Sequence, residues 1–381
     1  MNKFEQKIVL NELFKEKNQS ITCIEDFSNE IFYEIFDYFN GYEIIEKFSN
    51  LNSQFDKLLY SSLLLIKTHF FLFHYQKKII STFNKLEIFS TKIYSNLKIL
   101  SISFSKNIDL LDAHQWEIII LKYYPQLEKF YLNYYESINN DNQYPIYSGK
   151  INDFSSSFWI ERKWIFYVEI NFLNIEYKIR PYNKKWYDDR NNNIINYSTN
   201  LTLKFIDDSI FEEIERTLTI TKIYHLEIFE KEISISILIR ILNQLSQIIT
   251  LKVHSILTDG TTEITFEELD IVWSMKEISK ITKVYLKEIN NIKQLNVIFE
   301  FCPNMEYFKV GFINLLDIQL FFRTIFNNIK YYNHHPNSLC LNIPTADDKI
   351  LEDIKETIKY ENLPPPFIIK RVLDNVYLKW K

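Results

Sequence analysis

Glycine is nearly absent from this sequence of 381 residues, which contains only Gly41, Gly149, Gly260 and Gly311. The dinucleotide-binding pattern GxGxxG, the phosphate loop GxxxxGK(S/T) and the nucleophile elbow GxSxG each need closely spaced glycines. A side chain at those positions would keep the backbone away from a phosphate or block a sharp turn. No two glycines of this chain lie close together, so these three patterns and the chemistries that depend on them are excluded.

Cysteine is equally sparse. Cys23, Cys302 and Cys340 form no CxxC pair and predict neither a disulfide framework nor a zinc site. Residues 1–20 carry charges throughout and lack the apolar core of a signal peptide. The longest apolar stretch, residues 61–73, is interrupted by a lysine and a histidine and is too short to span a bilayer. The sequence therefore predicts a protein of the cytoplasm and/or the nucleus, with no membrane partner.

Basic charge is not in excess either. The net charge of −5 and the isoelectric point of about 5.9 make nucleic acid an unexpected partner. What the chain does have is 31 Phe and 25 Tyr, a bias typical of AT-rich codon usage. We interpret most of these aromatic residues as core-filling substitutes for leucine. With 46% hydrophobic and 24% charged residues, the chain is predicted to be globular.

From about residue 96 a short pattern recurs: an apolar residue, two variable positions, an apolar residue, one variable position and a third apolar residue. Its copies end at Ile102, Leu132, Ile228, Val253, Leu286 and Val310, and shorter forms end at Leu203 and Leu341. From Leu203 onward the copies are 24 to 33 residues apart, with amphipathic stretches between them. A strand and a helix repeated at that length predict an irregular leucine-rich-repeat-like α/β solenoid with a parallel sheet.

Helices and hairpins complete the predicted layout. Amphipathic helices are predicted at 109–123, 208–219, 232–246, 264–279, 291–302, 315–329 and 347–360. The segment at about 155–182 interrupts the repeat with period-two alternation and predicts an inserted β-hairpin. Residues 366–381 predict a second hairpin of the same kind.

No group of residues forms a catalytic or metal-binding motif. His334 and His335 are the only adjacent histidines, and a polar loop explains them better than a metal site, which needs three or four converging ligands. The acid pairs at 188–189 and 207–208 are interpreted as a turn and a helix cap rather than as catalytic carboxylates. The sequence therefore predicts no enzyme, no cofactor and no metal.

Trp159, Arg162 and Trp164, in the inserted hairpin, are residues that the codon bias does not explain. Tryptophan and arginine carry much of the binding energy at protein–protein interfaces, which makes these three residues candidates for substrate binding. The alternative is packing, since a hairpin on a repeat sheet also needs large side chains to bury.

Residues 24–59 stand apart, because eight acids and two lysines give them a net charge of −6. They read IEDFSNEIFYEIFDYFNGYEIIEKFSNLNSQFDKLL, with apolar residues at helical spacing in three short stretches. This segment resembles the F-box family, whose pattern is Leu-Pro-x-Glu-Ile-Leu-x-x-Ile-Phe-x-x-Leu, a gap, Asp-Leu-Leu, and Val-Cys-x-x-Trp. The residues that stand at the positions of this pattern are Phe27, Glu30, Ile31, Ile35, Phe36, Phe39, Ile44, Ile45, Leu51 and Phe55. Ser28, Asn52 and Phe55 depart from the family's Pro, Cys and Trp.

The resemblance implies that these ten residues bind a Skp-type adaptor of a cullin–RING ubiquitin ligase and that the repeats present an unknown protein substrate. It implies an N-terminal helix or tail at 1–23, an F-box-like helical domain at 24–62, a helical linker at 63–95 and a leucine-rich-repeat-like domain at 96–381. The alternative is a non-enzymatic repeat scaffold for protein–protein interaction, whose N-terminal helices cap the array and which has no ubiquitin role.

Overall fold

The computed structural model of this chain describes most of the region from residue 97 onward and a short strand before it. The described residues are 66–70, 97–105, 108–138, 154, 156–183, 199–207, 209–258, 271–274, 277–313, 318–332, 338–343, 348–360 and 367–380. The F-box-like segment, with its ten predicted adaptor-binding residues, lies outside this set. So does the pair His334 and His335.

Thirteen strands form one sheet in the order β1-β2-β3-β5-β4-β6-β7-β9-β11-β12-β13-β15-β14. Their bounds are Ile66–Phe70 (β1), Ile99–Ser105 (β2), Lys129–Ser137 (β3), Trp164–Ile170 (β4), Asn174–Pro181 (β5), Thr199–Leu203 (β6), His225–Ile228 (β7), Thr250–Val253 (β9), Lys283–Ile289 (β11), Tyr307–Ile313 (β12), Ser338–Asn342 (β13), Phe367–Val372 (β14) and Asn375–Trp380 (β15). Eight of the twelve pairings are parallel, so the predicted α/β class with a mostly parallel sheet is confirmed.

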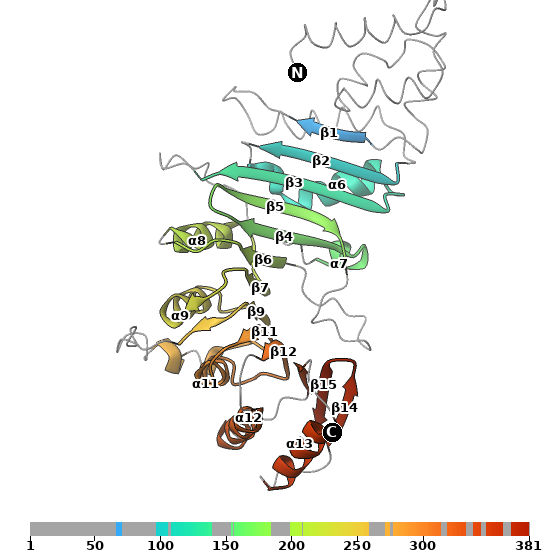
Figure 1. The fold of residues 1–381 in the computed structure, drawn as a ribbon. Coiled ribbons are helices and arrows are strands. Elements are labelled where there is room, and N and C mark those ends of the chain that lie inside the picture. Colours follow the sequence, from blue (N-terminus) through green and yellow to red (C-terminus); the bar gives the residue numbers. More distant parts are fainter. Residues whose placement is uncertain are drawn as a thin grey trace, which may run out of the picture.

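Helices cover one side of this sheet. They are a 3-10 turn at Ile108–Leu111, α6 (Ala113–Tyr123), α7 (Ser157–Glu161), α8 (Ile210–Ile220), α9 (Ile235–Gln244), α11 (Lys293–Phe301), α12 (Ile318–Tyr332) and α13 (Asp348–Tyr360). Figure 1 shows α8, α9, α11 and α12 along the same side of the strands. Two short strands, β8 (Ile233–Ser234) and β10 (Ile256–Leu257), pair separately next to the start of α9.

Apolar side chains hold the helices to the sheet, because they occupy the same register position in one strand after another. One such row is Leu201, Leu226, Leu251, Val284, Phe308 and Leu339, from β6 to β13. Each of these side chains is at most 2% exposed. Since strand side chains alternate between the two faces, the apolar positions two residues further on form a second buried row on the same side.

The turn from helix to strand has the same geometry at three places, Tyr124, Leu245 and Cys302. The N–H of each of these residues donates a hydrogen bond to the carbonyl oxygen four residues back, and its own carbonyl oxygen accepts one from the N–H three residues further on. The N–O distances are 2.9 to 3.2 Å. All three are buried. Pro125 and Pro303 follow two of them, where proline ends the helix because it has no N–H to donate.

The predicted hairpin insertion is present as two antiparallel strands, β4 and β5, which lie within the sheet. β5 pairs with β3 on one side and with β4 on the other, and β4 then pairs in parallel with β6. The C-terminal hairpin repeats this arrangement, because β15 lies between β13 and β14. The chain order is β3, α7, β4, β5 in the first unit and β13, α13, β14, β15 in the second. In each unit the second hairpin strand pairs with the preceding strand, so β14 occupies a position equivalent to that of β4.

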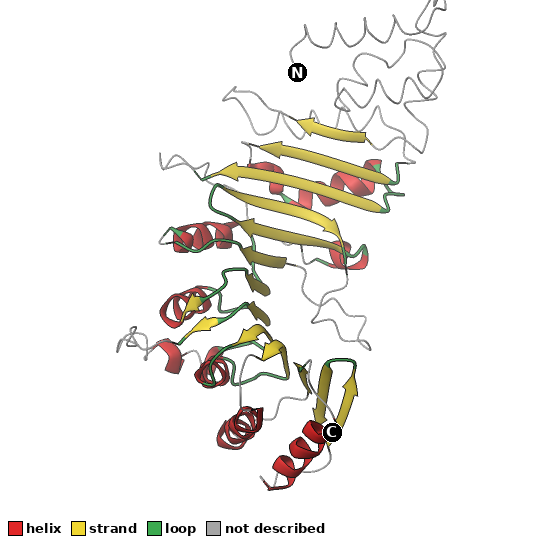
Figure 2. Cartoon of the chain, in the orientation of Figure 1, coloured by secondary structure: helices red, strands yellow, loops and turns green. Residues whose placement is uncertain are grey.

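Two details differ from the sequence-based expectations. The linker at 63–95 is predicted to be helical, yet its described residues 66–70 form β1, which pairs in parallel with β2. Backbone hydrogen bonds to a neighbouring strand outweigh the weak helical preference of so short a segment. The segment 157–161, predicted as part of the hairpin, is the helix α7, shown red beside β4 in Figure 2. In that helix Phe158 and Trp159 both face the core.

We predict that Leu251→Ala lowers the free energy of unfolding by about 2 to 5 kcal/mol, because it leaves a cavity in the middle of the buried row. The matched control is Leu121→Ala on α6, where the leucine is 53% exposed and the expected change is within about 0.5 kcal/mol. Urea denaturation followed by circular dichroism measures both. Equal losses in the two variants would contradict the assigned core.

Candidate functional site

The side of the sheet that faces away from the apolar rows carries polar and aromatic residues, and we call its surface on β6 to β15 the open face. Figure 2 shows that the described helices longer than one turn do not pack on it. Its described side chains belong to Asn200, Thr202, Lys204, His225, Glu227, Phe229, Thr250, Lys252, His254, Lys283, Tyr285, Lys287, Tyr307, Lys309, Ser338, Cys340, Asn342, Asn375, Tyr377 and Lys379. Most of them are half-buried, since each is flanked by the strands on either side.

Two lysines and a tyrosine form a cluster at the centre of the open face. Lys252, Tyr285 and Lys309 are register neighbours on β9, β11 and β12. The Lys252 ammonium lies 5.5 Å from the Tyr285 ring centroid, and the Lys309 ammonium lies 5.1 Å from it. Lys252 also lies 5.5 Å from the ring of Phe229 and forms an ion pair with Glu227. These distances are within the cation–π range, so the aromatic rings hold both ammonium groups in place.

Gly311 makes room for this cluster. A Cβ added at Gly311 would lie 2.7 Å from the Tyr285 hydroxyl oxygen and 2.7 Å from the carbonyl oxygen of Lys287. Both distances are too short for a real contact, so the tyrosine ring reaches across the glycine only because no side chain is there. The need for glycine at this position is one of space rather than of backbone angle.

The charge of the open face changes along the sheet. Lysines at its β9, β11, β12 and β15 positions are Lys252, Lys283, Lys287, Lys309 and Lys379, and none of the described open-face positions of β9 to β15 is an aspartate or glutamate. On β4 and β5, which adjoin the open face at β6, acids and lysines pair with one another. Lys178 contacts Glu169 and Glu176, and Lys204 contacts Glu169. The C-terminal half of the open face is therefore basic.

The pKa of His254, at the end of β9, responds to this environment. Burial lowers it, the positive charges of Lys287 and Lys231 lower it further, and Glu288 and Glu232 partly oppose the shift. A lowered pKa means that the neutral imidazole is favoured.

One open-face position, Cys340 on β13, is a buried thiol. Burial raises the pKa of Cys340 on β13, against the smaller opposing effects of a hydrogen bond with Tyr377 and of the charge on Lys309. The thiol is 2% exposed and uncharged, so the accessible chemistry of this half of the face comes from its lysines and aromatic rings.

The predicted substrate-binding residues are packing residues, which corrects that expectation for the two tryptophans. Trp159 is fully buried and Trp164 is 1% exposed. Both rings contact Phe130, with centroid distances of 6.2 and 5.6 Å. Arg162 lies over the Trp164 ring at 5.1 Å and donates a hydrogen bond of 3.1 Å to the carbonyl of Leu127. The three side chains anchor α7 and β4 to the neighbouring turn, so the packing alternative explains them.

The sequence carried a signal for the open face that residue type alone did not reveal. In each copy of the pattern, one variable position separates the last two apolar residues, and strand alternation directs that position away from the core. These positions are Thr202, Glu227, Lys252, Tyr285, Lys309 and Cys340, which are register neighbours in the sheet. Comparing this variable position from copy to copy would have brought Lys252, Tyr285 and Lys309 together as neighbours in a parallel sheet.

A second group of charges is buried on the helix side. Arg216 of α8 contacts Glu136 of β3 and lies 3.7 Å from Glu213. Burial acts to lower the pKa of Arg216, but the hydrogen bond and charge of Glu136 outweigh it, so the pKa is raised and the guanidinium stays charged. Both acids are less than 9% exposed, so this group joins α8 to the sheet and is closed to a ligand.

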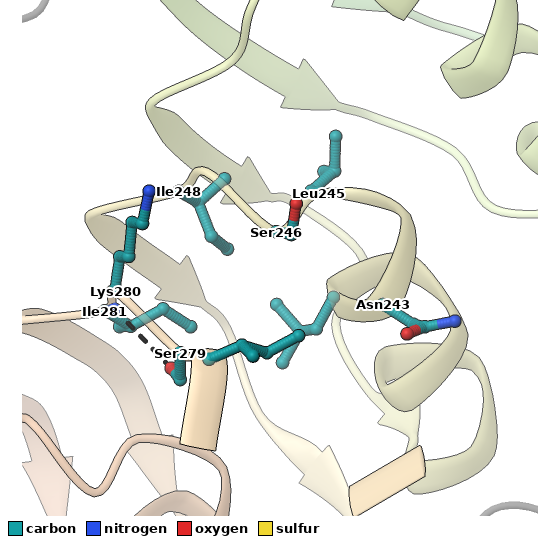
Figure 3. Close-up of a pocket in the computed structure, with 9 residues that line it drawn as sticks. Asn243, Leu245, Ser246, Ile248, Ser279, Lys280 and Ile281 are labelled. Carbon is teal, nitrogen blue, oxygen red and sulfur yellow. Dashed lines mark hydrogen bonds between the residues drawn. The ribbon is translucent and has the colours of Figure 1, made fainter. Parts of the chain in front are cut away.

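A small pocket lies between the end of α9 and residues 278–281 (Figure 3). Its walls are mainly apolar, and its one charged residue, Lys280, donates a hydrogen bond of 2.7 Å to the side chain of Gln247. The cavity volume of about 10 Å³ is close to the least space that a single water needs, so this pocket holds no substrate.

Two further searches of the described residues gave no site. They contain no group of three or more His, Cys, Asp or Glu side chains placed to hold a metal ion. Among the same residues, no helix has the length and apolar character to cross a membrane. Comparison of the whole chain with known proteins found no matching family, no matching curated protein and no matching solved structure.

We predict that Gly311→Ala lowers the free energy of unfolding by about 1 to 3 kcal/mol, because the new Cβ collides with the Tyr285 hydroxyl and the Lys287 carbonyl. Adding Tyr285→Phe removes the first collision and leaves the second, so the double variant recovers part of the loss. Thermal unfolding of the wild type, both single variants and the double variant gives this coupling. Ser338→Ala, on the same face, is the control and changes stability by less than about 0.5 kcal/mol. Additive losses in the double variant would show that the ring does not lie against Gly311.

Proposed function

We propose that this protein is a non-catalytic receptor that binds a partner protein through the open face of its sheet. We further propose that its F-box-like segment, residues 24–59, binds a Skp-type adaptor, which makes the chain a substrate-recognition subunit of a cullin–RING ubiquitin ligase. The leucine-rich-repeat-like solenoid, with its recurring turn and register, is part of the same proposal.

The observation that carries the proposal is the difference in side-chain composition between the two faces of the sheet. The helix side is occupied by a continuous apolar core, whereas the described open face offers half-buried aromatic rings and cations on successive strands. Tyrosine and phenylalanine surrounded by polar groups are typical of protein interfaces. A broad face without a deep pocket among the described residues suits a macromolecule better than a small substrate.

The adaptor-binding half of the proposal is supported by the sequence of residues 24–59. The segment resembles the F-box pattern over the ten positions given above, with Phe55 in place of the Trp, and its apolar residues are more numerous than a unit of its size can bury alone. Apolar surface left over in this way favours binding to another protein.

The second candidate is a repeat scaffold that binds partners through the same face and has no ubiquitin role. It is supported by the need of stacked repeats for a capping unit at their end. Deleting residues 1–62 separates the two candidates. A cap is required for solubility, so the remainder would aggregate under the scaffold proposal, whereas a separate adaptor-binding domain can be removed without loss of the folded sheet.

We predict that the purified full-length protein captures a Skp-type adaptor and that Ile35→Asp with Phe39→Asp weakens this capture at least about tenfold, because each change places a charge in an apolar contact. The matched control is Tyr33→Asp with Tyr38→Asp, which adds the same charge at variable positions of the F-box pattern and leaves capture unchanged. Capture on an affinity resin, followed by mass spectrometry, gives the measurement.

Circular dichroism of each variant shows whether the sheet remains folded, so loss of capture is not confused with unfolding. No capture by the folded wild-type protein, or equal capture by the Ile35 and Phe39 variant, would refute the adaptor-binding role.

A further inference from the structure

We propose that the basic half of the open face, made of Lys252, Lys283, Lys287, Lys309 and Lys379, binds an extended, carboxylate-rich segment of a partner protein. This inference rests on the proposed function, because it names the class of ligand that the receptor face takes. It starts from charge. The described open-face positions from β9 to β15 carry five lysines and no acid. When Glu227 of β7, which pairs with Lys252, is counted with them, five positive charges and one negative charge give a net charge of +4. A ligand that complements this surface is acidic.

The cations of the cluster are arranged in advance of binding. Lys252 and Lys309 are held at 5.5 and 5.1 Å from the same Tyr285 ring, and Lys252 has Phe229 on its other side. A lysine that is already confined by aromatic contacts loses less side-chain freedom when it binds an acid. Because Gly311 has no side chain, the Tyr285 ring can lie against the sheet. The ammonium groups of Lys252 and Lys309 therefore lie on either side of the ring and are not covered by it.

The spacing of the lysines fits an extended chain that crosses the strands. Lys252, Lys283 and Lys309 lie on three neighbouring strands and alternate between two register rows. Strands are about 4.8 Å apart and alternate residues along a strand about 6.7 Å apart, so successive lysines in this zigzag are about 8 Å apart at their Cα atoms. An extended peptide presents every second side chain on one side at about 6.7 Å. Lys252 and Lys309 share one register row two strands apart, so their Cα atoms are about 9.6 Å apart, which lies between the spacing of about 6.7 Å for acids two residues apart and about 13 Å for acids four residues apart. An extended segment with acids at every second position therefore brings at least two carboxylates within reach of these three lysines.

The residue types favour carboxylates over phosphates. Arginine binds phosphate through a planar, two-pronged guanidinium, whereas lysine offers a point charge. The described open-face positions from β9 to β15 include no arginine. Two described arginines are occupied elsewhere, with Arg216 against Glu136 and Arg162 over Trp164.

Nucleic acid fits this face less well than protein does. Binding of single-stranded nucleic acid depends on aromatic rings that are open for stacking by bases. Tyr285 is instead flanked by two ammonium groups and lies against Gly311.

The test uses the full chain and a fluorescently labelled peptide of about 12 residues with glutamate at every second position and threonine between. Fluorescence anisotropy at low salt is expected to give a Kd at least about tenfold lower than that of the same peptide with glutamine in place of glutamate. Lys283→Glu with Lys309→Glu is expected to weaken glutamate-peptide binding at least about tenfold. Lys349→Glu with Lys359→Glu is the matched control, because both lysines are exposed on α13 and the change in net charge is identical. This control keeps the Kd within about twofold of wild type.

Carbodiimide cross-linking then locates the bound peptide, since it joins carboxylates directly to lysine amines. Cross-links are expected at Lys252, Lys283 or Lys309. Cross-links confined to lysines outside the basic half would overturn the inference. So would equal binding of the glutamate and glutamine peptides, binding only when phosphoserine replaces glutamate, or tighter binding of a single-stranded RNA that depends on the same lysines.

The Lys283 and Lys309 variant is also tested for capture of the Skp-type adaptor, which it should retain. If the wild-type protein captures the adaptor but ignores the acidic peptide, the ligand class is wrong and the proposed function stands. If it binds the peptide but captures no adaptor, the ubiquitin role is wrong and the ligand class stands.

Discussion

A single register runs through the parallel strands from β6 to β13, and the rest of the structure depends on it. Because an apolar residue occupies the same position in each strand, the helices α8, α9, α11 and α12 can all pack on one continuous surface. A slip of one residue in any strand would turn its buried residues outward, so the hydrophobic effect enforces the alignment. The same alignment brings Lys252, Tyr285 and Lys309 together although they are far apart in the sequence.

The two faces of the sheet are thereby separated in their roles. The apolar face determines whether the chain folds, whereas substitutions on the open face change stability less, because its side chains are half-buried and no described helix packs on them. Gly311 is the exception, because the ring of Tyr285 needs the space above it. A surface of this kind can acquire a new specificity without repacking the core, which is the property expected of a recognition domain.

Much of the fold was predictable, and the parts that were missed have specific causes. In the thirteen-stranded sheet, the spacing of apolar residues located every strand from β2 to β13 outside the inserted hairpin, because burial on one face leaves a strong period in the sequence. It did not locate the two-residue strands β8 and β10, which pair separately. It missed β1, which is held by pairing with β2, and α7. Trp159 of α7 and Trp164 of β4 resembled an exposed hot spot, but both rings fill the space next to Phe130. The Lys252, Tyr285 and Lys309 cluster was missed because its members belong to different copies of the apolar pattern and the variable position between the last two apolar residues was not compared from copy to copy. The strand order and register of the structure make these residues neighbours.

The two hairpins, β4 with β5 and β14 with β15, show where a further strand could be added to the sheet. In the first unit the outer edge of β4 carries β6 and everything that follows it, and β14 presents the equivalent edge in the second. Within the described residues, the topology therefore leaves at β14 a set of backbone donors and acceptors that are geometrically ready for another parallel strand. Lys370 and Arg371 oppose uncontrolled pairing there, as charged side chains do on other sheet edges. Side-chain charge, rather than the geometry of the strand, therefore disfavours the addition of another strand at this edge.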